Sequence, residues 1–375
     1  MKNSETLLMV AESEHDANML YATGMFVPDP FIYFRTRGRT YIVMSDLEMD
    51  RAKKQAPHCQ VLSLSRYQKQ LREEGLKRPG FADVICRIFR ERRIRQARVP
   101  QNFPLGLASD LQQRKLRVKP LPEVFPQREL KSPPEVAKLS DALRMSEAGM
   151  ETGIRVLRAS KIRGRSLIYQ GTPLTSERLR AAIDKAIIDK GGLASHTIVA
   201  GAEQGCDPHD SGHGPLRADE SIILDIFPRS QSTGYFGDLT RTVVRGRASE
   251  AVHKLYATVQ GAQKAAFRAM RPGVPTMEIH KTVQEFFLKE GYETGKKNRR
   301  MQGFFHGTGH GLGLEIHEQP RMGPTSPGKL KAGQVITVEP GLYYPGVGGV
   351  RLEDVALLTA TGNRNLTRCP QVLEI

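Results

Sequence analysis

The chain has 375 residues, of which 39% are hydrophobic and 26% are charged, with a formal net charge of +16. These values fit a globular protein of about two domains and exclude a disordered chain. The absence of an apolar run of about 18 residues and of a leader-like N-terminus excludes a membrane-spanning protein and predicts a cytoplasmic one. The four cysteines are widely scattered and form no CxxC pair, so neither a disulfide framework nor a zinc ribbon is indicated.

Residues 1–125 predict an α/β domain. Apolar runs that read as strands occur at 5–10, 31–36, 40–45, 61–64 and 116–121, and a helix is predicted over 46–55. A proline-rich stretch at 119–135 then marks a linker, which we place at 126–132, with a second domain over 133–375.

A basic stretch lies within the first domain. Between Arg87 and Lys119 there are ten Lys or Arg residues against two acids, Glu91 and Asp110. No aromatic residues suited to base stacking and no nucleic-acid-binding motif accompany them. A solvated basic face is therefore favoured, and nucleic acid is not expected as a partner.

The second domain predicts two helix pairs. Ser132 and Glu135 form a capping box that opens a long amphipathic helix, and a second helix begins near Thr175 and ends at Gly191. Ser249 opens a third helix that ends at Pro272, and a fourth, starting at Thr276, closes before Gly291.

An internal repeat follows these helix pairs. LRADESIILD (216–225) and LKAGQVITVE (330–339) align without a gap, and each reads as a strand that ends on an acid, Asp225 or Glu339. A second acidic strand follows each copy, with Asp238 in the first and Glu353 in the second. We expect a pseudo-two-fold α+β fold that brings the four carboxylates together.

Histidines gather beside the second copy. FFHGTGHGLGLEIHE (304–318) contains His306, His310 and His317, and its alternating glycines predict a strand that another backbone approaches closely. A glycine-rich strand with merely hydrogen-bonded histidines is the simpler alternative. However, four converging carboxylates require compensation, and two divalent cations with a histidine ligand would supply it. Two such ions about 3.5 to 4 Å apart share one hydroxide, which predicts metal-assisted hydrolysis.

These motifs, taken in order, resemble the pita-bread metallopeptidases, the family of aminopeptidase P, prolidase and methionine aminopeptidase. The resemblance covers about 133–375. It implies five metal ligands, which are Asp225, Asp238, His310, Glu339 and Glu353. Because oxygen ligands with one nitrogen suit such metals, we expect two divalent ions, with Mn²⁺ as the first choice and Co²⁺, Zn²⁺ or Fe²⁺ as alternatives.

The resemblance also implies roles for other residues. Glu339 matches a ligand that shuttles a proton, and His317 matches a residue that stabilises the tetrahedral intermediate. His306 and Arg351 match substrate-side residues. A further substrate-side histidine is either His209 or His213, and the family's spacing favours His209. The separation of 13 residues between Asp225 and Asp238 exceeds the family's usual 11, so the intervening loop is expected to differ.

The first domain is similar to the N-terminal domain of aminopeptidase P and prolidase. This likeness favours peptides with proline at the second position as substrates. Together, the two resemblances and the metal chemistry lead us to expect an Xaa-Pro aminopeptidase or Xaa-Pro dipeptidase that uses a bridging hydroxide and forms a homodimer. One alternative is a catalytically silent pita-bread protein that binds a protein or nucleic acid through its basic surface. Another is an amidohydrolase similar to creatinase, which in that family needs no metal.

Overall fold

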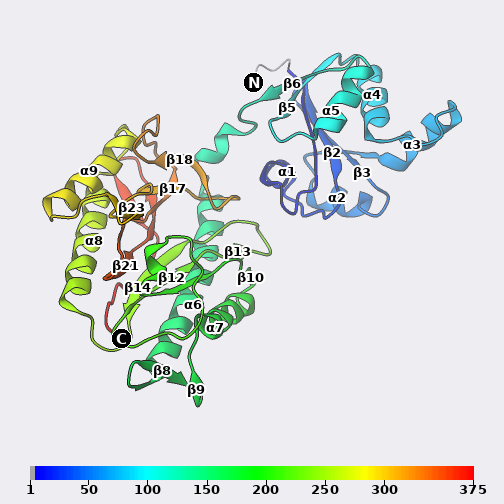
Figure 1. The fold of residues 1–375 in the computed structure, drawn as a ribbon. Helices are drawn as coiled ribbons and strands as arrows, with labels where there is room; N and C mark the ends of the chain where they lie inside the picture. Colours follow the sequence, from blue (N-terminus) through cyan, green and yellow to red (C-terminus); the bar gives the residue numbers. More distant parts are fainter. Residues whose placement is uncertain (1–4) are drawn as a thin grey trace. The chain divides into compact units, whose positions relative to one another are not determined.

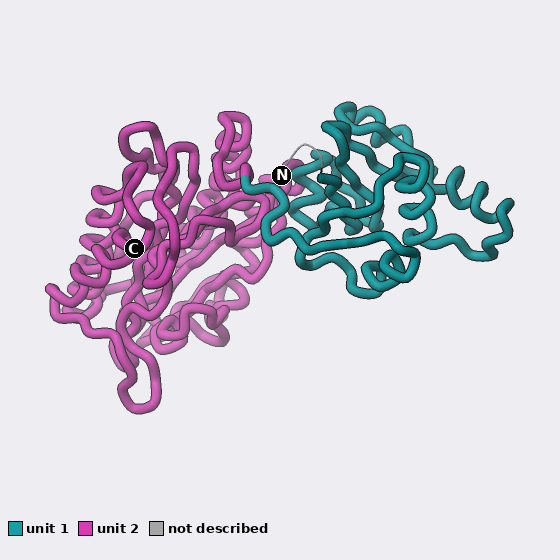
Figure 2. The backbone as a smooth tube through the Cα atoms, turned by 90° about the horizontal axis from the view of Figure 1, so that it is seen from above, with its two compact units in different colours: residues 1–126 teal, residues 127–375 magenta. Residues whose placement is uncertain are grey.

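The structure is a computed structural model that describes residues 5–375. It divides after Pro126 into two compact units, drawn in teal and magenta in Figure 2. Each unit has its own sheets and its own buried core. The units are described separately below.

The first unit is a mixed α/β domain with one sheet in the order β4-β3-β2-β1-β5-β6. β1, β2 and β3 pair antiparallel, whereas β4, β5 and β6 join in parallel. Its strands are β1 (Leu7–Ala11), β2 (Phe31–Thr36), β3 (Arg39–Met44), β4 (Gln60–Ser63), β5 (Gln96–Pro100) and β6 (Arg117–Leu121). Its helices are α1 (Ala17–Thr23), α2 (Met49–Gln55), α3 (Leu64–Glu73), α4 (Phe81–Glu91) and α5 (Leu105–Gln113).

Alternation along the strands gives this sheet two apolar faces. In β1, Leu8 packs with the helix α4 residue Ile85, while Leu7 packs with Met19 of α1 on the other face. The result is the three-layer α/β arrangement visible in Figure 1. The predicted α/β class is confirmed, but β5 and helices α1, α3, α4 and α5 were not among the predicted elements.

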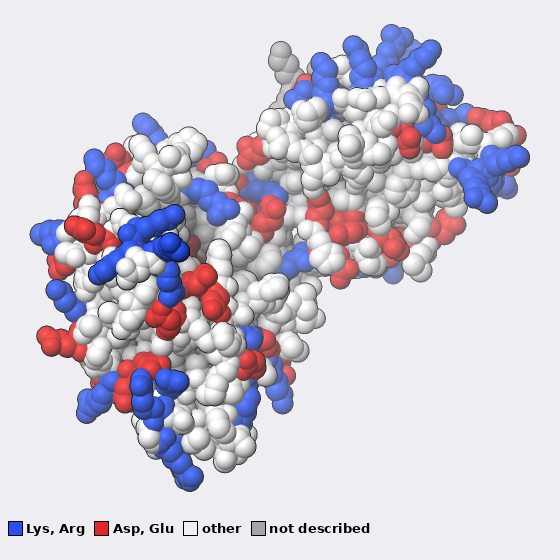
Figure 3. Space-filling model, in the orientation of Figure 1, with Lys and Arg blue, Asp and Glu red and all other residues white. Residues whose placement is uncertain are grey.

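The basic stretch of the first unit follows α4, β5, α5 and β6. Figure 3 shows Lys and Arg gathered on that side of the unit and Asp and Glu on the opposite side. Several of these cations have partners within the unit: Arg87 pairs with Glu74 at 2.7 Å, and the Arg92 guanidinium lies 4.9 Å from the ring centroid of Tyr41. These contacts account for part of the basic stretch without a nucleic acid.

The second unit begins with a short 3₁₀ turn, η1 (Pro126–Glu129), which overlaps the boundary, and the helix α6 (Pro133–Ala159). The predicted capping box is present, because the Ser132 amide donates to Glu135 Oε2 at 2.8 Å. The remaining helices are α7 (Ser176–Asp189), α8 (Glu250–Ala269) and α9 (Thr276–Lys289), and η2 (Gln204–Cys206) is a second 3₁₀ turn. All four predicted helices are therefore confirmed.

Two sheets carry the repeat. The first has the order β11-β12-β14 and the second β18-β17-β19-β22-β23. Their strands are β11 (Ile198–Gly201), β12 (Ser221–Ile226), β14 (Leu239–Val244), β17 (Gly309–Gly311), β18 (Glu318–Met322), β19 (Val335–Val338), β22 (Asp354–Leu358) and β23 (Asn363–Asn365). The smaller strands are β7 (Lys161–Arg163), β8 (Ser166–Tyr169), β9 (Thr172–Pro173), β10 (Gly192–Leu193), β13 (Arg229–Ser230), β15 (Gly295–Lys297), β16 (Arg300–Gln302), β20 (Gly341–Tyr344) and β21 (Gly348–Arg351).

The two halves of the repeat meet along β14. The Glu353 amide donates to the Thr240 carbonyl at 3.1 Å, and the Arg351 amide donates to Thr242 Oγ1 at 3.0 Å. These bonds join a strand of the first half to the end of β21 and to the segment that follows it in the second. The longer loop between Asp225 and Asp238 contains β13, which pairs with β10.

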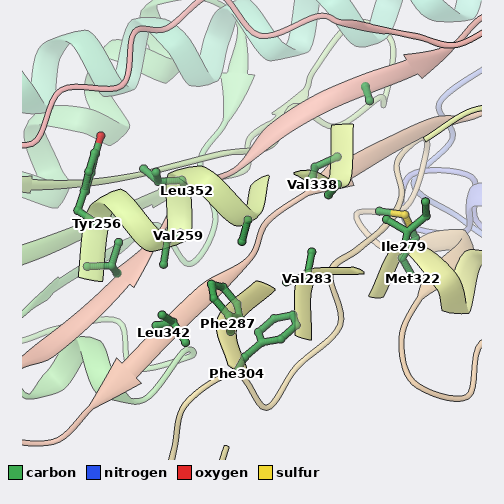
Figure 4. Close-up of a cluster of buried hydrophobic side chains, with 14 of the residues drawn as sticks. Tyr256, Val259, Ile279, Val283, Phe287, Phe304, Met322, Val338, Leu342 and Leu352 are labelled. Atoms are coloured by element: carbon green, nitrogen blue, oxygen red, sulfur yellow. The ribbon is translucent and has the colours of Figure 1, made fainter. Parts of the chain in front are cut away.

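Helices α8 and α9 pack on the sheet of the second half, and an apolar core lies between the helices and the sheet. Figure 4 shows Val259, Val283, Phe287 and Phe304 pointing into it together with Leu342. Figure 1 shows α6 and α7 on the side of the first half. This packing fixes the strands whose ends carry the acids.

The glycines of 304–318 lie where other backbones pass closely, as predicted. A Cβ on Gly309 would lie 1.9 Å from the Thr337 carbonyl oxygen, and one on Gly311 would lie 2.1 Å from that of Gln319. Only a bare backbone fits between these neighbours. Within residues 5–375, no helix is both long and apolar enough to cross a membrane.

Candidate active site

A pocket of about 630 Å³ opens on the second unit where the two halves meet. It brings together nine of the residues singled out in the sequence. They are Asp225, Asp238, His310, Glu339, Glu353, His209, His306, His317 and Arg351. The alternative histidine, His213, is exposed and is not among the lining residues, whereas His209 is.

The four acids of the pocket lie at or beside the ends of strands. Asp225 lies in β12, and Asp238 directly precedes β14. Glu339 directly follows β19, and Glu353 stands between β21 and β22. Corresponding positions in the two repeats therefore supply one acid each to the same pocket.

His310 lies in β17, among these acids. Its Nε2 is 3.3 Å from Glu339 Oε1 and 3.6 Å from Asp238 Oδ2. Its Nδ1 lies 3.2 Å from the Gly311 carbonyl oxygen, which is its acceptor when Nδ1 carries the proton. That tautomer leaves the Nε2 lone pair facing the carboxylates, as a metal-binding histidine requires.

One group of side chains could hold a metal ion directly. Asp238, His310 and Glu353 each offer a ligand atom, and these atoms lie within 4.8 Å of one another. Glu353 is oriented by Thr240, whose hydroxyl donates to Glu353 Oε2 at 2.7 Å. Two carboxylates and an imidazole are donors that suit divalent transition metals.

Electrostatics in the pocket favour a bound cation. Burial raises the pKa of Asp238 and of Glu353 well above the usual range, and repulsion between the neighbouring carboxylates raises both further. Burial also raises the pKa of Glu339 to about 7, and lowers that of His310 to about 3. The neutral imidazole is the form that binds a metal.

Arg351 is a buried cation that bridges the halves. It donates to Asp225 Oδ2 at 2.7 Å and to the Tyr343 hydroxyl at 2.9 Å. Tyr343 in turn lies 2.9 Å from His306 Nε2. Asp225 is therefore held by Arg351 in this structure, while the other three acids face His310 or one another.

Tyr343 is a site residue that sequence reasoning missed. It lies in β20, is fully buried, and connects His306 with Arg351 through its hydroxyl. In the sequence, GLYY looks like an ordinary core strand. Only the β20–β21 hairpin, which pairs Tyr343 with Gly349, brings the hydroxyl to Arg351.

Arg321 is the second residue that sequence reasoning missed. It lies in β18 opposite His310 and lines the pocket with an exposed side chain. Nearby, the ring of His317 meets that of His310 edge-on, with centroids 4.4 Å apart. Burial lowers the pKa of His317, and the charge of Arg321 lowers it further. Four residues beyond His317, Arg321 belongs to no motif that a single sequence reveals.

Residues 137–360 match the model of metallopeptidase family M24. The chain belongs to that family. The match covers most of α6, the other three helices of the second unit, both repeats, and the four acids and His310 described above.

Two known proteins illustrate what this M24 chain is similar to in sequence. An uncharacterized peptidase of Staphylococcus saprophyticus is 32% identical over 64% of the chain and 63% of its own length. A Xaa-Pro dipeptidase of Pyrococcus furiosus is 35% identical over 48% of the chain and 49% of its own length. These alignments thus span between about half and two thirds of the relatives.

The fold has solved counterparts over nearly its full length. The structure of a Xaa-Pro dipeptidase from Bacillus anthracis superposes with a TM-score of 0.83, covering 99% of this chain and 95% of that one at 22% identity. This likeness confirms the predicted pita-bread fold and the presence of an N-terminal α/β domain before it.

Proposed function

We propose that this chain is a Xaa-Pro peptidase that depends on two divalent metal ions. The observation that carries the proposal is the buried group of Asp238, His310 and Glu353, with Glu339 beside it, at the floor of an open pocket. The raised pKa values of the carboxylates in this group indicate a site that binds cations. The proposed ligands are Asp225, Asp238, His310, Glu339 and Glu353.

Two bound divalent cations would lower the pKa of a water between them toward neutrality and so supply a nucleophile. Two observations support such a pair. The acids come from both halves, and three of them have raised pKa values, which bound cations would lower again. Mn²⁺ is the metal we propose, because the ligands are mostly carboxylate oxygens with a single imidazole nitrogen. Asp225 would serve as a ligand while keeping its bond with Arg351.

The chain's own residues would guide the proton and the charge. Glu339 faces the pocket, with its side chain 19% exposed, so it can accept the proton of the attacking water and pass it to the proline nitrogen as the peptide bond breaks. His317 would donate a hydrogen bond to the oxygen of the attacked carbonyl, where negative charge develops.

Substrate binding would involve the pocket wall. His209 and His306 line it, and His306 is held by Tyr343, so its orientation is set before a peptide arrives. Arg321 gives the wall an exposed cation. We assign it to the free carboxylate of a short Xaa-Pro peptide.

We make three further proposals, on the domains, the oligomeric state and the substrates of this chain. Residues 1–125 would form the N-terminal domain, 126–132 a linker and 133–375 the catalytic domain. The chain would act as a homodimer. Peptides with proline at the second position would be its substrates.

The test compares a Xaa-Pro dipeptide with a longer peptide that has proline at the second position. Each is assayed with Mn²⁺ and after removal of metal by a chelator. We expect hydrolysis of the Xaa-Pro bond that is lost with the chelator and restored by Mn²⁺. Absence of hydrolysis with every divalent metal tried would count against the proposal and favour a silent pita-bread protein.

A further inference from the structure

The residue after His317 is a buried carboxylate with four donors. Glu318 is 8% exposed, and its Oε1 accepts from the amides of Leu314 at 3.0 Å and Glu315 at 3.2 Å. Lys131 Nζ lies 2.7 Å from Oε2, and Arg128 Nη2 lies 2.5 Å from Oε1. A buried carboxylate that accepts this many hydrogen bonds fixes the positions of the groups that donate them.

What Glu318 holds is the turn that carries His317. The amides of Leu314 and Glu315 open this turn, and the carboxylate also packs on the bare backbone of Gly313. A Cβ on Gly313 would lie 2.5 Å from Glu318 Oε2. The turn at 313–317 thus folds around the carboxylate of Glu318, the residue that follows it. The shape of the turn depends on the position of that carboxylate.

The two cations come from the first residues of the second unit. Arg128 and Lys131 stand in the segment before α6, and the Lys131 side chain is 1% exposed. The segment is itself anchored, because the Lys131 amide donates to the Gly333 carbonyl at 2.7 Å. Glu129 pairs with Lys331 at 2.7 Å on the segment's exposed side.

We propose that Glu318 is a positioning residue for His317, and that Lys131 and Arg128 hold it in place. The chain of contacts runs from the anchored segment through Glu318 to the turn, and from the turn to His317 beside His310. His317 lines the pocket and is partly exposed, so the backbone of the turn, together with the ring contact to His310, sets its position. The kinetic part of this inference rests on the proposed function, in which His317 stabilises developing charge.

A merely structural ion pair would behave differently. It would lower the stability of the whole unit when broken, and it would affect activity in the same proportion whether or not His317 were present. A positioning role makes the effect depend on His317. The two accounts therefore separate in a double-mutant cycle.

The test uses the full chain with metal bound, and Lys131→Met as the main substitution. We expect kcat to fall roughly 10- to 100-fold with little change in KM, since a small displacement of a catalytic group costs about that much. Lys131→Arg should recover most of the rate, because it keeps the charge. In a His317→Ala background, Lys131→Met should cost less than about twofold.

The matched control is Lys331→Met, which removes a lysine that pairs with the same segment but does not touch Glu318. It should leave kcat unchanged. An equal loss in Lys331→Met, or the same loss from Lys131→Met with and without His317, would overturn the proposal. Glu318→Gln provides a second route to the same cycle if Lys131→Met folds poorly.

A second readout does not require activity. Hydrogen exchange of the amides of Leu314 and Glu315 should become at least about tenfold faster in Lys131→Met, with exchange in α9 unchanged. Unchanged exchange at those two amides would overturn the proposal. If the wild-type chain hydrolysed no Xaa-Pro peptide but exchange still changed, the proposed function would fail while the positioning of the turn stood.

Discussion

The two halves of the second unit supply similar acids but different surroundings. Asp225 and Asp238 of the first half correspond to Glu339 and Glu353 of the second, and each pair lies in or directly beside corresponding strands. The second half alone supplies His306, His310, His317 and Arg321 to the pocket, while the first half supplies His209.

The halves also hold each other's acids. Arg351 of the second half bonds to Asp225 of the first, and Thr240 of the first half bonds to Glu353 of the second. The paired acids, together with His310, are thus suited to holding cations, and the other residues that only one half supplies are suited to orienting a substrate. This division yields experiments that should affect the two tasks separately.

The largest effect should come from the acids, and it should be similar for either half. Asp238→Asn and Glu353→Gln should each lower kcat/KM by roughly 1000-fold or more. Each should also reduce the amount of tightly bound Mn²⁺, measured by elemental analysis after gel filtration. Full metal content with full activity in one of the two variants would show that the halves do not share the site.

Next in size is a pH effect on the metal-free protein. The pKa of Glu339 is about 7 when folded, above its ordinary 4.5, so protonation of this buried group favours the folded state. Relative to Glu339→Gln, the wild type should gain stability as pH falls from about 7 to 4.5, by about 3 kcal/mol at most. The gain is complete below 4.5 and absent above 7.

Chemical unfolding of the wild type and Glu339→Gln in chelator, at several pH values, measures this difference. The comparison with the variant is needed because His306 and His310, whose pKa values burial lowers to about 3, act in the opposite direction over the same range. A difference that stays flat with pH would contradict the assignment.

A moderate effect should follow removal of the Tyr343 hydroxyl, which joins two polar side chains of the second half. Tyr343→Phe leaves His306 and Arg351 without their shared partner, and should lower kcat/KM roughly 10- to 30-fold. Metal content should remain that of the wild type, in contrast with the acid variants. Tyr344→Phe, at the neighbouring exposed hydroxyl, serves as the control.

The smallest effect should concern one class of substrate. Arg321→Ala should raise KM for a Xaa-Pro dipeptide about tenfold, since a charge-assisted hydrogen bond to its carboxylate is lost. A dipeptide amide, which lacks that charge, should show little change. Equal changes for both substrates would remove Arg321 from carboxylate recognition.

Much of the second unit could be predicted because its features repeat or carry standard end signals. The capping residues Ser132, Thr175 and Ser249 mark helix starts, and the offset between the two repeats aligns the acids before any contact is known. The residues that complete the pocket carry no such signal. Arg321 meets His310 through strand register, and Tyr343 meets Arg351 through a hairpin.

The first unit shows a different limit. Helix α4 buries Val84, Ile85 and Ile88 at helical spacing, but its arginines led us to read the region as a basic face. Strand β5 was hidden by the same charges, since Arg98 interrupts its apolar run. Long basic side chains can cover an apolar face without disturbing it, so charge density alone is a poor guide to the backbone.

The bond between Arg351 and Asp225 has a consequence for charge balance. With Asp225 paired to Arg351, three carboxylates of the ligand group remain uncompensated. One divalent ion leaves this group net negative, whereas a second makes it net positive, or neutral once the water between the ions has lost a proton. An incoming peptide's carboxylate would thus bind more tightly at full occupancy than at half occupancy. Metal loading would then govern how tightly short peptides bind as well as how fast they react.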